Sequence, residues 1–172
     1  MLQRTHSAAG VLAAEWVLHA YQVPLLSWDT AGALLLGCFA GPLADIDKPG
    51  SVMAKLFFPV SSLLRMLHIH HRTMTHSLLF LVLLATASFP IPALYYSTFL
   101  LAYASHPLID LLNEQGVALF WPVRTKIRLL PKFLAIDTGS RGEDVFCFLL
   151  ICLCFWLPAR EWWIGWMQLA MR

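Results

Sequence analysis

The sequence predicts an all-α protein, a polytopic membrane helical bundle of about five transmembrane helices with a metal site at one end. Composition predicts the membrane environment: 59% of the 172 residues are hydrophobic and only 13% are charged, whereas a soluble domain carries about 25% charged residues. Five apolar stretches predict the helices. His and Asp residues at the ends of these stretches predict the metal site. We expect residues 1–172 to form a single domain, since one domain contains about 150 residues.

The first two predicted helices cover residues 8–21 and 30–44. Glu15 and His19 are four residues apart, so they share one face of the first helix. Ionisable residues at membrane depth are candidates for a functional role. A structural Glu15–His19 pair near the far interface is the simpler interpretation. The second helix is rich in Gly and Ala, which allows close helix packing.

Two carboxylates follow the second helix. Asp45 and Asp47 are separated by one residue, an arrangement that can aim both side chains at one cation. The sequence from Asp47 to Gly50 is equally compatible with a plain turn. Beyond it, residues 53–67 form an amphipathic segment that we expect to lie along the membrane interface.

Residues 70–77 combine three histidines, one arginine and three hydroxyl groups directly before an apolar run. A neutral imidazole binds divalent metals through a ring nitrogen. His71 and His76 are five residues apart and can converge where a loop enters a helix. The alternative is a polar interfacial loop whose His and Arg side chains meet lipid headgroups or stabilise a helix end.

The forty residues from 73 to 112 are long enough for two spans, with a tight turn at Pro90 and Pro92. His106 and Asp110 are four residues apart near the end of the second span and lie on one helix face. They can hold one metal together, or Asp110 can orient His106 from behind. A purely structural hydrogen bond between them is the remaining alternative.

A basic connector occupies residues 116–142 and precedes a last helix from residue 145 to residue 157 or beyond. Nearly all Lys and Arg residues fall on one side of this five-span topology, which makes that side cytoplasmic. The potential ligands gather at the same ends of the spans: His6, Asp45, Asp47, His71, His76, His106, Asp110 and Glu143. Mixed His and Asp ligation suits Zn²⁺, with Mn²⁺ or Fe²⁺ as alternatives, better than Ca²⁺ or Mg²⁺ alone.

An ordered series of short motifs covers most of the chain. Its members are Thr5-His6, Pro42 with Asp45 and Asp47, His71-Arg72 with Thr75-His76-Ser77, Ser105-His106 with Asp110, Gly116-Val117 with Leu119-Phe120-Trp121-Pro122, and Thr138-Gly139-Ser140 with Glu143. The series resembles the YdjM-like family, bacterial inner-membrane proteins described as LexA-regulated, membrane-bound metal-dependent hydrolases. Two positions depart from the family pattern: Asn113-Glu114 stands where Thr-Pro is common, and Arg141-Gly142 adds a charge to the last motif.

The resemblance implies a metal-dependent hydrolase of the bacterial inner membrane, a multi-pass protein with its site on the cytoplasmic side. The family is also distantly similar to zinc-dependent phospholipase C and P1-type nucleases, which implies cleavage of a phosphoester. We therefore expect membrane lipids as partners, a phosphorylated lipid as substrate and no nucleic-acid partner; the formal net charge of +2 is too small to favour one.

Roles follow for individual residues. The expected metal ligands are His6, Asp45, Asp47, His76, His106 and Asp110, and His71 acts in or beside this set. Arg72 is expected to stabilise developing negative charge on phosphate. The general base is expected to be one of Asp45, Asp47 and Glu143 that is not committed to metal. The alternative function is a non-catalytic metal-binding or metal-transporting membrane protein, for which only Glu15 and His19 offer polar groups within the bilayer. A structural membrane subunit is a third interpretation.

Overall fold

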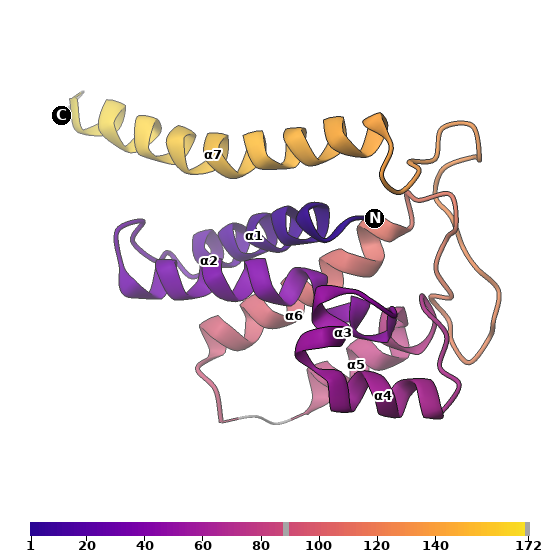
Figure 1. Cartoon of the computed structure of the whole chain (residues 1–172). Helices are drawn as coiled ribbons and strands as arrows, with labels where there is room; N and C mark the ends of the chain where they lie inside the picture. The colour runs from indigo at the N-terminus through magenta and orange to yellow at the C-terminus, as the bar shows by residue number, and fades with distance from the viewer. Residues whose placement is uncertain (88–89, 171–172) are drawn as a thin grey trace.

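A computed structural model describes residues 1–87 and 90–170. Throughout these residues the regular structure is helical, as the sequence predicts, and isolated bridges at Asn113–Ile136 and Val117–Ile127 are the only β-type pairing described. The elements, shown in Figure 1, are α1 (Gln3–Ala20), α2 (Trp28–Ala40), the 3₁₀ helix η1 (Gly41–Asp47), α3 (Val52–Leu56), α4 (Phe58–Met66), the 3₁₀ helix η2 (Met74–His76), α5 (Leu78–Thr86), α6 (Ala93–Asp110) and α7 (Arg141–Ala170).

Helices α1 and α2 pack closely because glycines face each other where they meet. A Cβ added to Gly10 would lie 2.1 Å from the Gly37 carbonyl oxygen, and one added to Gly41 would lie 2.2 Å from the His6 carbonyl oxygen. Only glycine permits this approach of two backbones. The contact places the first turns of α1 directly beside η1, so it brings His6 to the segment that carries Asp45 and Asp47.

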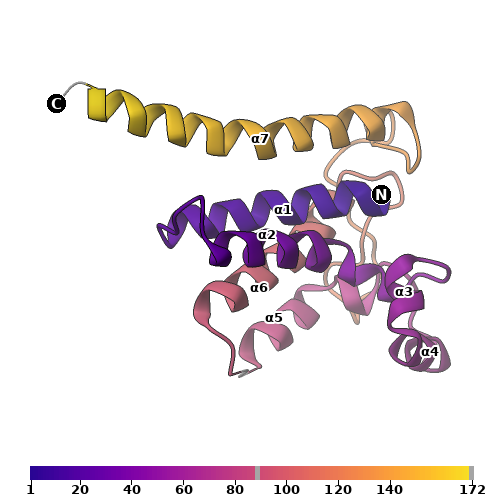
Figure 2. The ribbon, with the colours of Figure 1, turned by 60° about the vertical axis from the view of Figure 1, so that its left-hand side comes forward.

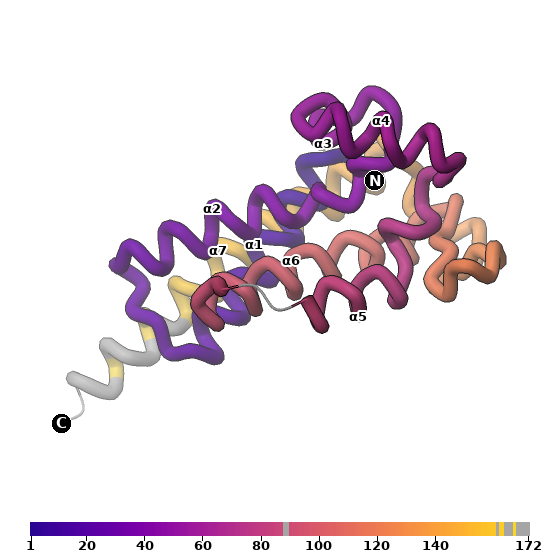
Figure 3. Tube along the Cα trace, turned by 90° about the horizontal axis from the view of Figure 1, so that it is seen from below, coloured from indigo at the N-terminus to yellow at the C-terminus, as the bar shows by residue number. Residues whose placement is uncertain are grey.

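The other long helices cover two sides of the α1–α2 pair. α6 packs against both α1 and α2, whereas α7 packs along α1 on the opposite side, as Figures 1 and 2 show. α5 lies beside α6 (Figure 3), so the chain reverses direction between them and the turn predicted near Pro90 and Pro92 is present. As a result, the end of α6 returns to η2, which immediately precedes α5.

The number of membrane spans differs from the expected five. Within the described residues, two stretches are long and apolar enough to cross a membrane, Trp28–Asp47 and Arg141–Arg160. α1 carries Arg4 and Glu15 among its 18 residues, and α5 contains only nine residues. α6 has 18 residues, but several are Ser, Thr or Tyr, and it ends in His106 and Asp110. Helices therefore occupy all five predicted places, but polar residues and short length keep three of them below the requirements of a span.

Apolar and polar side chains are distributed unusually. α5 has no buried residue, and large apolar side chains of α7, such as Phe148 and Phe155, are exposed. In contrast, most of the largest fully buried side chains are polar, with Arg72 first and His6, His76, His106 and Glu143 close behind. Burying ionisable groups is unfavourable unless they are paired or bind a metal. This polar core is therefore the feature that requires an explanation.

Candidate metal centre

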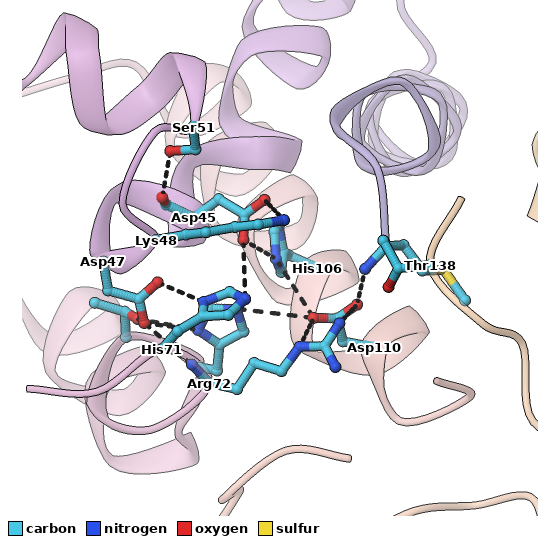
Figure 4. Close-up of polar contacts among 12 residues, drawn as sticks. Asp45, Asp47, Lys48, Ser51, His71, Arg72, His106, Asp110 and Thr138 are labelled. Atoms are coloured by element: carbon cyan, nitrogen blue, oxygen red, sulfur yellow. Dashed lines mark hydrogen bonds and ion pairs between the residues drawn. The ribbon is translucent and has the colours of Figure 1, made fainter. Parts of the chain in front are cut away.

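Four separate parts of the chain deliver the buried polar side chains to one place. The first turn of α1 supplies His6, and η1 supplies two carboxylates. His71 comes from the loop before η2 and His76 from η2 itself, while the last two turns of α6 supply His106 and Asp110. Figure 4 shows the labelled members pointing toward one another. The seven residues of this His/Asp cluster are His6, Asp45, Asp47, His71, His76, His106 and Asp110.

Three overlapping sets within the His/Asp cluster have the spacing of metal ligands. In each set the ligand atoms all lie within 4.8 Å of one another. The sets are Asp45, Asp47, His71 and His76; His6, Asp45 and His106; and His76, His106 and Asp110. All seven residues are buried except His71, whose side chain is 23% exposed. Access from outside is therefore easiest next to His71.

Three of the imidazoles are held in the same way, through Nδ1. His106 Nδ1 donates to the Gly41 carbonyl oxygen at 2.8 Å, and His71 Nδ1 donates to Asp47 Oδ1 at 2.8 Å. Because Thr75 Oγ1 donates to Asp47 Oδ2 at 2.6 Å, it accepts from His76 Nδ1 at 3.0 Å. An imidazole fixed by an Nδ1 hydrogen bond presents Nε2 as a lone pair, which is the usual orientation of a metal-binding histidine.

The Nε2 atoms face carboxylate oxygens at distances too long for hydrogen bonds. His106 Nε2 lies 3.6 Å from Asp45 Oδ1, His6 Nε2 lies 3.6 Å from Asp110 Oδ1, and His76 Nε2 lies 3.9 Å from Asp110 Oδ2. The buried Nε2 atoms of these three histidines have no hydrogen-bond partner in the described part of the chain. Two atoms that each bind zinc at about 2.0–2.2 Å lie at most about 4.4 Å apart. The residues therefore fit a divalent metal.

The electrostatic environment keeps His76 in the metal-binding form. Burial lowers the pKa of His76, and the neighbouring His106 lowers it further, although Asp47 and Asp110 act in the opposite direction. His6 and His106 also stack face to face, with ring centroids 3.5 Å apart and an interplanar angle of 3°. Burial lowers the pKa of His6 well below its usual value, and the adjacent His106 lowers it further.

Arg72 lies beside the cluster, and its guanidinium contacts the side chains of Asp110, Asn113 and Gln115. Nε lies 2.9 Å from Asp110 Oδ2, and Nη1 donates to Asn113 Oδ1 at 2.6 Å and to Gln115 Oε1 at 3.3 Å. Its backbone has a φ of 64°, and its amide donates to Asp47 Oδ2 at 3.2 Å. A left-handed conformation is unfavourable for a non-glycine residue and persists only where its surroundings hold it. Arg72 is therefore positioned to orient Asp110.

Glu143 is also buried, but it belongs to none of the three metal-type sets. Its Oε1 accepts from the Thr5 hydroxyl at 2.9 Å and from the Leu2 amide, and its Oε2 accepts from the Gly139 amide at 2.7 Å. Both oxygens are thus occupied by donors from α1 and from the loop before α7. The structure places Glu143 as a connection between the first turns of these two helices.

Two residues of the site were given no role by the sequence-based prediction. Thr75 bridges Asp47 and His76, and it is part of the motif around His76, which is a signal for it. Asn113 lies in the turn just after α6, where its amide donates to the Asp110 carbonyl oxygen at 3.1 Å. It accepts from Arg72 and donates to the Ile136 carbonyl oxygen at 2.7 Å, so it links the site to the connector.

Glu15 and His19 lie toward the other end of α1 and do not join the cluster. They line a separate pocket of about 380 Å³ whose other walls are mainly apolar, among them Leu34 and Leu157. The Glu15 side chain is half-buried there. These residues therefore form a second region of the molecule.

Comparison with known proteins identifies relatives along most of the chain. The family described as YdjM inner membrane protein matches residues 1–170. The inner membrane protein YdjM of Escherichia coli (strain K12) is 30% identical over 169 residues, which cover 92% of this chain and 83% of that protein, and the Shigella flexneri protein of the same name gives the same values. The uncharacterized protein YvsG of Bacillus subtilis (strain 168) is 28% identical over 159 residues, covering 91% and 94%. No solved structure matches.

Proposed function

The chain belongs to the YdjM inner membrane protein family, and on this premise we propose that it is a membrane-bound metal-dependent hydrolase. Its substrate is a phosphoester of a lipid or lipid-like molecule, cleaved at the cytoplasmic surface of the bacterial inner membrane. The observation that carries the proposal is the shared orientation of His71, His76 and His106, each held through Nδ1 with Nε2 turned into the cluster.

A purely structural cluster would be built differently. Buried histidines that only stabilise a fold donate and accept hydrogen bonds at about 2.7–3.2 Å through both nitrogens. Here the Nε2 atoms of His6, His76 and His106 are buried without such partners among the described residues. Leaving a buried polar atom unpaired costs about 1–3 kcal/mol. Three such atoms facing the same carboxylates support a cation as the absent partner.

The ligand chemistry supports Zn²⁺, with Mn²⁺ or Fe²⁺ as alternatives. The cluster combines four imidazoles with three carboxylates, and this mixture of nitrogen and oxygen ligands suits these ions. The principal ligands are His6, Asp45, Asp47, His76, His106 and Asp110. A tetrahedral site takes four ligands, so six or seven converging residues support more than one ion.

A divalent metal held here supplies Lewis acidity toward a phosphoryl oxygen and lowers the pKa of water. The protein's own groups orient the site: Asp47 fixes His71, Thr75 fixes His76, and the Gly41 carbonyl oxygen fixes His106. The cation of Arg72 lies against Asp110 and holds its carboxylate toward the cluster. In this role Arg72 acts through Asp110.

Asp45 differs from the other two candidate general bases in the contacts of its side chain. Both oxygens of Asp47 and of Glu143 already accept hydrogen bonds. Asp45 instead lines a pocket of about 360 Å³ and has Lys48 Nζ 3.8 Å from its Oδ2. We therefore propose a structural role for Glu143, and a general-base role for Asp45 where the metal is held by the other ligands.

The experiment is metal analysis and hydrolysis with the detergent-purified full chain. Protein loaded with Zn²⁺, Mn²⁺ or Fe²⁺ is incubated with phospholipids and isoprenoid phosphates, and released phosphate or headgroup is measured. We expect metal-dependent release that His76→Ala and Asp110→Ala abolish while the helical content is unchanged. Full metal occupancy in both variants would contradict the site. Metal binding without hydrolysis of any substrate would instead support a non-catalytic metal-binding protein.

A further inference from the structure

A basic pocket adjoins the exposed edge of the His/Asp cluster. It has a volume of about 430 Å³ and lies between the end of α4, the loop into η2 and the connector. Its charged or polar lining includes His68, His70, His71, Thr73, Arg124 and Lys126, with Trp121 beside them. None of the described residues that line this basic pocket is acidic. The chemistry favours an anion, and a phosphate group suits the Arg and Lys donors.

An apolar pocket adjoins the same cluster from another side. It has a volume of about 280 Å³ and is enclosed by η1, α4, α5 and α6. Its lining includes Leu64, Phe80, Leu84 and Phe99, and its polar members, Thr75 and Tyr103, lie at the cluster. The Tyr103 hydroxyl is already used, because it donates to the Thr75 carbonyl oxygen at 2.5 Å. This pocket therefore favours a hydrocarbon chain.

Asp47 joins the two pockets. Its Oδ1 accepts from His71, which lines the basic pocket, and its Oδ2 accepts from Thr75, which lines the apolar pocket. One carboxylate of the cluster thus lies between the basic pocket, which suits an anion, and the apolar pocket, which suits a hydrocarbon chain. A water-soluble phosphoester would make no use of the second place, and a neutral lipid would make no use of the first.

We propose that the site binds a phosphate-bearing amphiphile, with its headgroup in the basic pocket and its hydrocarbon chain in the apolar pocket. This inference rests on the proposed function for its reaction, but the binding itself does not require hydrolysis. The apolar chain would enter between α4 and α5, where Val60 is 47% exposed at the pocket wall. The phosphate would approach His71, the cluster member with the exposed side chain.

The headgroup half is tested by binding of dodecyl phosphate to the detergent-purified full chain. In the double variant Arg124→Gln/Lys126→Gln we expect affinity to fall roughly tenfold or more, the scale of losing a charge-assisted hydrogen bond. The matched control is Lys55→Gln/Arg65→Gln, which removes the same charge from exposed positions outside the pocket. Equal losses in both double variants would show only general surface attraction and would overturn this half.

The hydrocarbon half is tested by filling the apolar pocket. Leu84→Trp on α5 should reduce the affinity for dodecyl phosphate to that for butyl phosphate, because each methylene that the pocket covers contributes about a fourfold gain. Val82→Trp lies on the same helix outside the pocket lining, is 55% exposed and should have no effect. Val60→Trp narrows the pocket from α4 and should repeat the loss, so the result does not depend on one variant's folding.

Two further measurements separate the sources of the ligand and the two proposals. If inorganic phosphate binds the wild type as tightly as dodecyl phosphate does, the proposal of an amphiphile is overturned. If inorganic phosphate competes only weakly with dodecyl phosphate, and Arg124→Gln/Lys126→Gln abolishes this competition, the proposal is supported.

The His106→Ala variant should lose metal binding and hydrolysis. It should still bind dodecyl phosphate, and this binding should still be lost on adding Leu84→Trp. If dodecyl phosphate binds as described and the metal-loaded wild type hydrolyses nothing, the proposed function fails while the amphiphile site stands. Equal binding by Leu84→Trp and Val82→Trp would overturn the inference even in an active enzyme.

Discussion

Helix α1 carries polar residues at both ends, and the two ends differ in what surrounds them. Near its start, His6 is fully buried and faces Asp110 at 3.6 Å while stacking on His106. Near its end, Glu15 and His19 line a mainly apolar pocket. The region around His6 also receives side chains from α6, η1 and the loop into η2. In the region at the end of α1, by contrast, Glu15 and His19 both come from α1. A site of metal type needs donors from several segments, because one helix face cannot surround an ion.

The same comparison bears on function. A transporter requires polar groups along the path of the ion through the bilayer, whereas a hydrolase requires one dense site and an approach for its substrate. The His/Asp cluster gathers near the start of α1, and the basic and apolar pockets adjoin it. The two regions therefore support the hydrolase over the transporter, and variants at each end test the contrast.

The largest effect is expected from removing a shared ligand of the cluster. His106→Ala deletes a residue common to two of the three metal-type sets, so we expect metal affinity to fall at least about a hundredfold, beyond the 10–100-fold loss typical of supporting residues. Metal content after dialysis measures this. Glu15→Gln, at the other end of α1, serves as the control and should retain its metal. Equal losses in both variants would remove the distinction between the two regions.

Arg72→Ala should reduce turnover by roughly a hundredfold. The sequence alone predicts that metal binding is unaffected, since Arg is not a ligand. The structure adds a second consequence: Arg72 Nε lies 2.9 Å from Asp110 Oδ2, so metal affinity should also fall, by about tenfold. Titration with a competing chelator measures the affinity, and excess metal should restore occupancy but not turnover. Arg72→Ala with unchanged metal affinity would show that Asp110 needs no such support.

The contact between α1 and α2 lies between the two regions and holds both in place. A Cβ at Gly37 would lie 2.5 Å from the Gly10 carbonyl oxygen and 2.7 Å from Ala14 Cβ. We expect Gly37→Ala to destabilise the protein by about 1–3 kcal/mol through overpacking, measured by thermal unfolding in detergent. Gly32→Ala on the same helix meets only the Tyr95 side chain at 3.1 Å and should be much milder. Equal stability of the two variants would show that the close backbone approach is dispensable.

The smallest effect is expected at the far end of α1. Glu15→Gln with His19→Gln should leave metal content and hydrolysis within about twofold of the wild type, because surface or pocket substitutions away from a site change free energies by about 0.5 kcal/mol. Both assays are run on the same preparation. The opposite result, metal flux into proteoliposomes that this double variant abolishes without any hydrolysis, would favour the transporter.

Much of the fold was predictable because its signals are local. Apolar runs bounded by Pro and charged residues predicted helices where α1, α2, α5, α6 and α7 occur. The number of spans was not predictable in this way: α5 ends after nine residues, and polar residues lower the hydropathy of α1 and α6. Residues 53–67, predicted as an amphipathic segment, form α3 and α4.

The sequence by itself determined that the His and Asp motifs stand at helix ends, because they directly precede or follow apolar runs. It also determined that His106 and Asp110 share a face, because they are four residues apart in one helix. Only the tertiary structure decided which motifs meet. Gly10 and Gly37 let two backbones approach, which brings His6 to η1, and the return of α6 brings Asp110 to His76. The same packing turned Arg72 onto Asp110 and occupied both oxygens of Glu143 with donors. Asp110 and Thr5 come from distant segments, so no local pattern around Arg72 or Glu143 encodes these two contacts, whereas the Gly139 amide belongs to the local motif of Glu143.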